Sequence, residues 1–215
     1  MSVVKEPSRP YRSALRKRQA AETRERVVRA AGRLFSVQGY RATTFAQIAS
    51  EADVSVETVQ KHGPKTSLLQ AAVELASFGV EGETDVFATE VGQAILRVRD
   101  AEEFASLIGA GALSINAPSA GMWMTIVGAS RGDDELSAYQ EQMLAGIRAQ
   151  VERVLDHIRD RGWLRTDLPF DDIVETVCVL TGPEAYVRFV ELDGGSTDDY
   201  QAFVTRMLRE TVLAR

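Results

Sequence analysis

The sequence predicts an all-α protein with a small N-terminal helical domain followed by a larger helical body. Apolar residues recur at intervals of three and four through most of the 215 residues, and no segment alternates as a half-buried strand would. Hydrophobic residues make up 45% and charged residues 26%, a balance typical of globular proteins. This composition excludes a disordered chain and a disulfide-built miniprotein.

Charge is distributed unevenly along the chain, whose formal net charge is −6. Residues 1–66 carry 13 Lys and Arg against 6 Asp and Glu, whereas residues 67–215 carry 12 against 25. A basic segment ahead of an acidic one is typical of a nucleic-acid-binding domain joined to another domain. We therefore expect a basic arm at 1–20, a DNA-binding domain at 21–66 and a helical body at 67–215.

The first 20 residues predict a flexible arm, because they contain two prolines, few apolar residues and many cations. Two interpretations remain open: a solvated tail, or an arm that contacts phosphate or enters a minor groove. This start has no apolar segment and is not a secretory signal, so we expect a cytoplasmic protein. The basic residues are Lys5, Arg9, Arg12, Arg16, Lys17 and Arg18.

The next two helices are predicted from spacing and caps. Residues 23–38 place apolar side chains on one helix face, and Gly39 follows as a C-terminal cap. Thr44 and Gln47 have the spacing of a capping box, so a second helix is expected to begin after Thr44.

A tight turn then leads to a third helix. Asp53 tolerates left-handed geometry, and Ser55 is a good N-cap for a helix over residues 56–62. Gly63 and Pro64 end that helix, and Lys65 opens a fourth. Two short helices joined by so short a turn cross steeply, which is a helix-turn-helix.

The body is predicted to be entirely helical. Residues 104–130 carry no charge, which raises the possibility of a membrane span. Because Pro118 and polar residues lie in the middle, we expect instead two buried helices joined near Pro118. An amphipathic helix is expected over 133–161.

The last two helices are predicted at about 170–192, kinked at Gly182-Pro183, and at 197–214. Both are richer in apolar residues than one buried face requires. The surplus indicates a partner interface, and the alternative is that these helices close the core of the monomer.

The N-terminal domain resembles the DNA-binding domain of the tetracycline-repressor (TetR) family of bacterial transcriptional regulators. The resemblance rests on spacing, caps and turn together, over about a fifth of the chain. It is carried by Ala30-Ala31, Leu34-Phe35, Gly39-Tyr40, Thr43-Thr44, Ile48-Ala49, Ala52-Asp53-Val54-Ser55, Thr58-Val59 and Lys65.

The resemblance implies a homodimer, formed through the two C-terminal helices, whose third helix enters the major groove of an operator. It also implies that Thr44 and Lys65 hold phosphates at helix N-termini, where backbone N–H groups and the helix dipole favour anions. Gln60 is suited to adenine and Lys61 to guanine. The expected DNA-binding residues are Thr44, Ser55, Val56, Glu57, Thr58, Gln60, Lys61, His62 and Lys65.

A pocket for a small ligand is expected between the helices of the body. Its few charges indicate an apolar or aromatic ligand with one or two polar groups. Plain core packing is the alternative for Met and Trp at helical spacing. The candidates are Phe104, Leu107, Ile108, Asn116, Met122, Trp123, Met124, Ile126, Tyr139 and Met143.

Other chemistry has little support in the sequence. His62 is either a phosphate contact or structural, His157 is expected at a solvated or interface position, and Cys178 as a packed thiol rather than a redox sensor. Acidic clusters begin helices, where they suit the dipole. We therefore expect no catalytic residue, no metal and no cofactor.

The expected function is a DNA-binding transcriptional regulator, most simply a repressor that a small, largely apolar ligand releases from its operator. The alternative is a ligand- or protein-binding helical dimer with weakened DNA binding. Gln60 and Gly63 motivate it, because they stand where the family usually has aromatic residues. An enzyme is a third hypothesis, for which no acid–base pair is seen.

Overall fold

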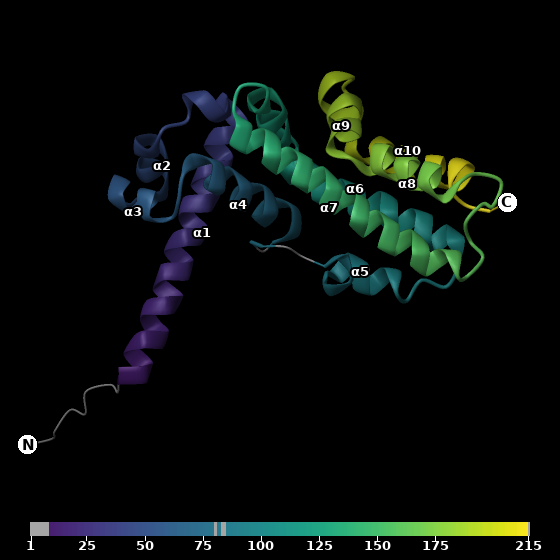
Figure 1. Ribbon diagram of the computed structural model, residues 1–215, viewed down its shortest axis with the longest axis horizontal. Helices are drawn as coiled ribbons and strands as arrows, with labels where there is room; N and C mark the ends of the chain where they lie inside the picture. Colours follow the sequence, from purple (N-terminus) through teal and green to yellow (C-terminus); the bar gives the residue numbers. More distant parts are fainter. Residues whose placement is uncertain (1–8, 80, 83–84, 215) are drawn as a thin grey trace, which may run out of the picture.

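The computed structural model describes residues 9–79, 81–82 and 85–214, with side chains from residue 14 onward. Over these residues the chain is helical and forms no strand, which confirms the all-α prediction. An isolated antiparallel bridge joins Leu164 to Leu213. The elements (Figure 1) are α1 Arg9–Ala42, α2 Phe45–Ala52, α3 Val56–Lys61, α4 Lys65–Phe78, η1 Val86–Ala88, α5 Glu90–Ile95, α6 Ala101–Ser130, α7 Asp134–Arg159, α8 Phe170–Thr181, α9 Pro183–Tyr186, η2 Val187–Leu192 and α10 Thr197–Thr211.

Helix α1 begins much earlier than the apolar periodicity predicts. The prediction of a flexible arm is wrong for residues 9–20, because these residues form the first turns of α1. Residues 1–8, with Lys5, lie outside the described part of the chain. Ala, Arg, Lys and Gln dominate residues 14–21, and these side chains lose little freedom in a helix. An ion pair between Arg18 and Glu22, one turn apart, adds modest support.

The helix-turn-helix forms with the caps that the sequence predicts. Gly39 adopts φ 79° and breaks α1 before its last residues. The Thr44 side chain accepts from the Gln47 N–H, and the Gln47 side chain accepts from the Thr44 N–H, so the capping box is confirmed. Asp53 is left-handed at φ 53° and Ser55 caps α3, which confirms the turn.

Two hydrophobic cores divide the molecule, and α6 contributes to both. The N-terminal core gathers buried residues of α1, α2, α3 and α4 around Phe35, Ile48 and Val59, and the last turns of α6 complete it with Trp123 and Ile126. The body core joins the first part of α6 to α5, α7, α8 and α10. The boundary predicted at residue 66 stays a prediction, although α4 beyond it packs into the N-terminal core.

Helix α6 is one continuous helix of 30 residues, so the expected pair of helices joined near Pro118 is wrong. Pro118 removes one backbone N–H, whose intrahelical partner would be the Ser114 carbonyl. Both residues are exposed, so water can satisfy that carbonyl. Packing of α6 against α1, α4 and α10 supports the helix on both sides of this point. Over the described residues, no helix is long and apolar enough to cross a membrane.

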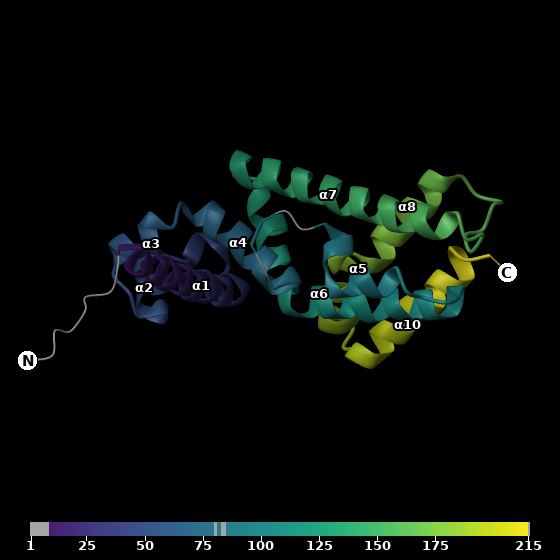
Figure 2. The ribbon, with the colours of Figure 1, turned by 90° about the horizontal axis from the view of Figure 1, so that it is seen from below.

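The remaining helices follow the prediction closely. Asp133 caps α7 by accepting from the Leu136 N–H, and the predicted kink at Gly182-Pro183 is confirmed as the break between α8 and α9. A π-helical turn, η2, continues from α9. Helix α10 ends at Thr211, and the residues after it pair with the segment before α8. Seen from below (Figure 2), the helix-turn-helix and the body lie at opposite ends of the long axis.

Candidate nucleic-acid interface

The predicted DNA-binding residues gather on the end of the molecule that is turned away from the body. Helices α2 and α3 form this end, with the body at the other (Figures 1 and 2). Exposed among the candidates are Thr44, Ser55, Glu57, Gln60 and Lys61. The half-buried candidates are Val56, Thr58, His62 and Lys65.

Thr44 is occupied by the cap of its own helix. Its hydroxyl accepts from the Gln47 N–H at 3.2 Å and lies 3.0 Å from Gln47 Oε1, to which it donates. The cap leaves the N–H groups of Phe45 and Ala46 as the outward donors at this helix end. A phosphate at the start of α2 would therefore be bound by these backbone groups, while the Thr44 side chain caps the helix and stabilises its N-terminus.

Lys65 ties α4 to the end of α1. Its Nζ donates to the carbonyls of Tyr40 at 2.7 Å and Thr43 at 2.9 Å, and it lies 4.4 Å from the centre of the Tyr40 ring. Burial lowers the pKa of this ammonium, while the nearby Asp133 carboxylate opposes the shift. Two of its three donors thus serve carbonyls left unpaired at the break in α1, and one remains for an external anion.

The packing that holds α3 centres on Val59 and Arg24. Val59 is fully buried in the N-terminal core. Arg24, on α1, donates to the carbonyl of His62 at 3.0 Å and pairs with Glu81 at 2.6 Å, which links the end of α3 to α1. Sequence reasoning missed Arg24, because its spacing marks only a polar helix position.

His62 lies at the edge of this cluster. Burial lowers the pKa of its imidazole, Arg24 lowers it further, and Glu81 acts in the opposite direction. The ring is therefore neutral at pH 7 and offers one N–H donor and one acceptor. Of the two roles left open for His62, the structural one has a visible basis, since its carbonyl anchors Arg24.

The outward side of α3 presents both a carboxylate and amide or amine donors. Hydrogen bonds from its own backbone N–H and from Ser55 lower the pKa of Glu57, which is ionised at neutral pH. The Ser55 and Thr58 hydroxyls are 3.1 Å apart. A carboxylate can accept from a cytosine amino group, whereas Gln60 and Lys61 suit adenine and guanine. Such a surface has the donors and acceptors for direct readout of bases.

The candidate ligand-binding residues of the body do not converge on one space. Phe104, Leu107 and Ile108 belong to the body core. Met122, Trp123, Ile126, Tyr139 and Met143 belong to the N-terminal core. Met124, next to the buried Trp123, is 42% exposed. These residues therefore divide between two separate cores, and the ligand pocket stays a prediction.

The polar candidate Asn116 is fully engaged inside the protein. Its Nδ2 donates to the Thr181 carbonyl at 2.8 Å and to the Tyr200 hydroxyl at 3.2 Å. On the same helix, the Trp123 indole donates to Glu184 at 2.9 Å. These bonds connect α6 to the ends of α8 and α9 and to α10, so a ligand that used Asn116 would have to displace them.

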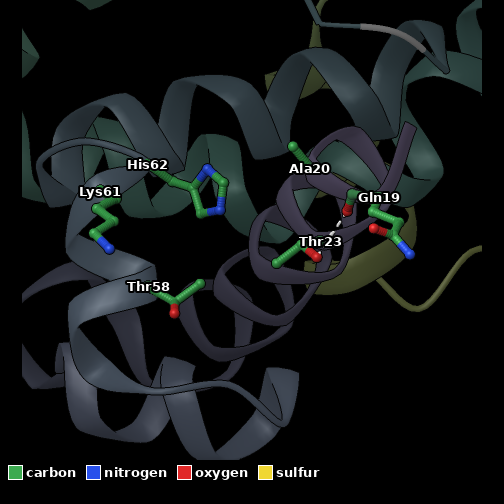
Figure 3. Close-up of a pocket in the computed structure, with 6 residues that line it drawn as sticks. All are labelled: Gln19, Ala20, Thr23, Thr58, Lys61 and His62. Carbon is green, nitrogen blue, oxygen red and sulfur yellow. Dashed lines mark hydrogen bonds between the residues drawn. The ribbon is translucent and has the colours of Figure 1, made fainter. Parts of the chain in front are cut away.

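Two open hollows lie on the described surface of the N-terminal domain, and no body residue lines either one. The first, of about 280 Å³, separates α1 from α3 (Figure 3). The second, of about 670 Å³, runs along α1 from Gln19 to Arg29. Among the described residues, no three His, Cys, Asp or Glu side chains are placed to hold a metal.

The C-terminal helices bury most of their apolar side chains within the monomer. Tyr200, Val204 and Leu208 of α10 are fully buried. Val179, at 63% exposure, and Leu192, at 69%, remain on the surface. Cys178 is half-buried, and burial raises the pKa of its thiol, which suits a packed rather than a reactive cysteine. The interface at these helices stays a prediction.

The sequence of the N-terminal domain matches a known family. Residues 27–72 match the sequence model described as bacterial regulatory proteins, tetR family. No curated protein matches the sequence.

Solved structures are similar over nearly the whole chain. A transcriptional regulator from Saccharomonospora viridis in complex with choline is 18% identical, with a TM-score of 0.69, and the match covers 91% of this chain and 100% of that one. NalD of Pseudomonas aeruginosa, the secondary repressor of the MexAB-OprM multidrug efflux pump, is 16% identical, with a TM-score of 0.65 and coverage of 90% and 98%. FadR of Bacillus subtilis in complex with stearoyl-CoA is 16% identical, with a TM-score of 0.68 and coverage of 86% and 96%. At these identities, the likeness shows a shared fold.

Proposed function

Because residues 27–72 belong to the tetR family of bacterial regulatory proteins, we propose that this chain is a DNA-binding transcriptional regulator that acts as a ligand-released repressor. One observation carries the proposal. Helix α3 is capped at Ser55, anchored through Val59 and Arg24, and turns Glu57, Gln60 and Lys61 outward on the end of the molecule away from the body. A short rigid helix that presents such side chains can enter a major groove and read base edges.

The proposed DNA contacts divide into two kinds. Gln60, Lys61 and Glu57 read bases, because their side chains project from α3 into solvent. The N-termini of α2 and α4 bind phosphates through backbone N–H groups. Thr44 and Lys65 assist this binding and stabilise the two helix ends through their own hydrogen bonds. Phosphate contacts set affinity and register, and base contacts set sequence preference.

The proposed assembly is a homodimer in the cytoplasm, formed through the two C-terminal helical segments: about 170–192, which comprises α8, α9 and η2, and 197–214, which contains α10. Val179 and Leu192 supply exposed apolar surface there. Two copies of α3 would then enter successive major grooves about 34–36 Å apart on a near-palindromic operator. The acidic body repels the duplex, which leaves the basic N-terminal domain as the approach surface.

A ligand could act through α6, because this helix contributes to both cores. Thr125 on α6 donates to the Phe35 carbonyl of α1 at 2.9 Å, and Thr66 on α4 donates to Glu135 on α7 at 2.7 Å. A ligand that separates α6 from α7, α8 or α10 would move these contacts and change the spacing of the two α3 helices. We propose a largely apolar ligand, since the body interior is apolar.

The test is selection from a random duplex library with the full-length protein, followed by fluorescence anisotropy on the selected duplex. We expect a strong preference over random sequence and a steep fall in affinity with salt. In this assay Gln60→Ala should change which bases are preferred, whereas the matched control Thr44→Ala should weaken binding to all sequences alike. A wild-type protein without sequence preference would refute the proposal.

The second candidate, a ligand- or protein-binding dimer with weakened DNA binding, has one observation in its favour. Both side chains expected to hold phosphates, Thr44 and Lys65, are already hydrogen-bonded inside the domain. A stable dimer that binds a ligand but selects no duplex would support this candidate instead.

A further inference from the structure

The start of α1 extends well beyond the domain it belongs to. All residues from 14 to 22, hereafter the α1 extension, are exposed. Figure 1 shows this part of the helix projecting past α3, away from the body at the far end of the molecule. Isolated helices of this length are only marginally stable in water. A contact with a binding partner would stabilise this exposed segment.

The charges of the α1 extension, and of α1 as far as Arg29, differ between two faces of the helix. On the side away from α3, each cation has an anion one turn away: Arg18 lies 3.4 Å from Glu22, and Arg29 lies 2.8 Å from Glu25. On the other side, the residues three and four positions from Arg16 and Lys17 include no acid. One face is therefore electrically balanced and the other is positive.

The positive face is the one that continues toward α3. At 100° per residue, Arg16 lies one turn before Ala20 and on the same side as Thr23, and both of these line the hollow of about 280 Å³ between α1 and α3. Lys17 lies two turns before Arg24, which contacts the end of α3. An apolar protein partner would require apolar residues along this face, whereas Arg16 and Lys17 require an anion.

The opposite wall of the hollow supplies further donors. Figure 3 shows Thr58 and Lys61 of α3 and its C-cap His62 on one side of the hollow, facing Gln19, Ala20 and Thr23 of α1. Lys61 is a cation, and Thr58 and Gln19 carry a hydroxyl and an amide that can donate to phosphate oxygens. No acidic side chain lines this hollow. The hollow and the positive face of the α1 extension thus form one continuous surface beside α3.

We propose that the α1 extension binds the sugar–phosphate backbone of the same duplex whose major groove α3 enters, with Arg16 and Lys17 on phosphates that flank this groove. The inference rests on the proposed function, since it needs α3 on DNA. It adds a second phosphate-binding surface, which is independent of the N-termini of α2 and α4. Its contacts do not read bases, so they would strengthen binding to any sequence that extends far enough.

The test compares two double variants of the full-length protein that remove equal charge from the same helix. Arg16→Ala/Lys17→Ala removes the positive face, and Arg18→Ala/Arg29→Ala removes two cations from the balanced face. Affinity is measured by fluorescence anisotropy against salt on a random-sequence duplex, and on the selected duplex with and without one extra helical turn of flanking DNA. Far-UV circular dichroism checks that α1 stays helical, since alanine is the best helix former.

Each lost phosphate contact lowers the slope of log affinity against log salt by about 0.9. We expect Arg16→Ala/Lys17→Ala to lower it by about 2 for each bound domain, and to remove the gain in affinity from flanking DNA. The control pair should keep the gain and most of the slope. Equal losses from both pairs, or no loss from either, would overturn the inference while leaving the proposed function intact. A wild-type protein that binds no duplex would instead refute the proposed function.

Discussion

Replacing Lys65 separates a structural role from a phosphate-binding role. In Lys65→Met the side chain keeps about the length of the lysine methylene stem and loses the charge and all three donors. The carbonyls of Tyr40 and Thr43, which it contacts at 2.7 and 2.9 Å, then lose a charged donor at the break in α1. We therefore expect this variant to destabilise the N-terminal domain as well as to weaken DNA binding.

The size of the effect follows from these two bonds. A hydrogen bond from a charged donor contributes about 1.5–3 kcal/mol, and because the two bonds share one half-buried ammonium we expect a total of about 2 kcal/mol. For a chain of this size, 1 kcal/mol corresponds to about 2–4 °C in Tm, so the fall should be about 4–8 °C. Differential scanning calorimetry of the full-length protein measures it.

Lys61→Met is the matched control, because Lys61 is exposed on α3 and makes none of these bonds. Its Tm should stay within about 1–2 °C of the wild type, since surface substitutions of this kind usually change stability by less than about 0.5 kcal/mol. If Lys65→Met kept the wild-type Tm yet bound every duplex more weakly, the ammonium would serve phosphate rather than the carbonyls. That result would refute the reasoning.

Three further predictions concern the hydrogen bonds of Arg24, Thr44 and Asn116. Arg24→Met removes a cation that lowers the pKa of His62, so that pKa should rise, as NMR titration of the two histidines can show. The folded-state pKa of His62 lies below its unfolded value, so the protein loses stability as the pH falls through the unfolded value. This loss should be smaller in Arg24→Met. An unchanged His62 pKa would contradict the contact between Arg24 and the end of α3. Thr44→Val keeps the shape of the side chain and removes the cap, so it should lower the free energy of unfolding, measured with urea, by about 1 kcal/mol. Thr44→Ser keeps the hydroxyl and should lower it little. Equal losses from the two variants would argue against the capping box. Asn116→Leu leaves the Thr181 carbonyl without its donor and should lower the free energy of unfolding by about 1–3 kcal/mol. Tyr200→Phe leaves that carbonyl paired and should lower the free energy of unfolding less. A larger loss from Tyr200→Phe would be inconsistent with these bonds.

Long-range packing explains where the body differs from what the sequence pattern suggests. Pro118 predicts a break, yet α6 continues through it because helices on several sides hold it and the freed carbonyl faces solvent. The apolar residues of α6 looked like one pocket lining, but the helix spans two cores and divides them between the two. Periodicity identifies a buried face and carries no information on which element covers it.

The helix-turn-helix was determined by the sequence alone, because the interactions that shape it act within a few residues. Gly39 and Asp53 take left-handed geometry, and the caps at Thr44 and Ser55 close on the third residue after each. Only the tertiary structure decided how this motif is held and extended. The Arg24 and Lys65 contacts join residues 38, 25 and 22 positions apart, and residues 9–20 extend α1 ahead of its apolar stripe. Caps and turns are local hydrogen-bonding choices, whereas these features depend on where distant carbonyls and neighbouring helices lie.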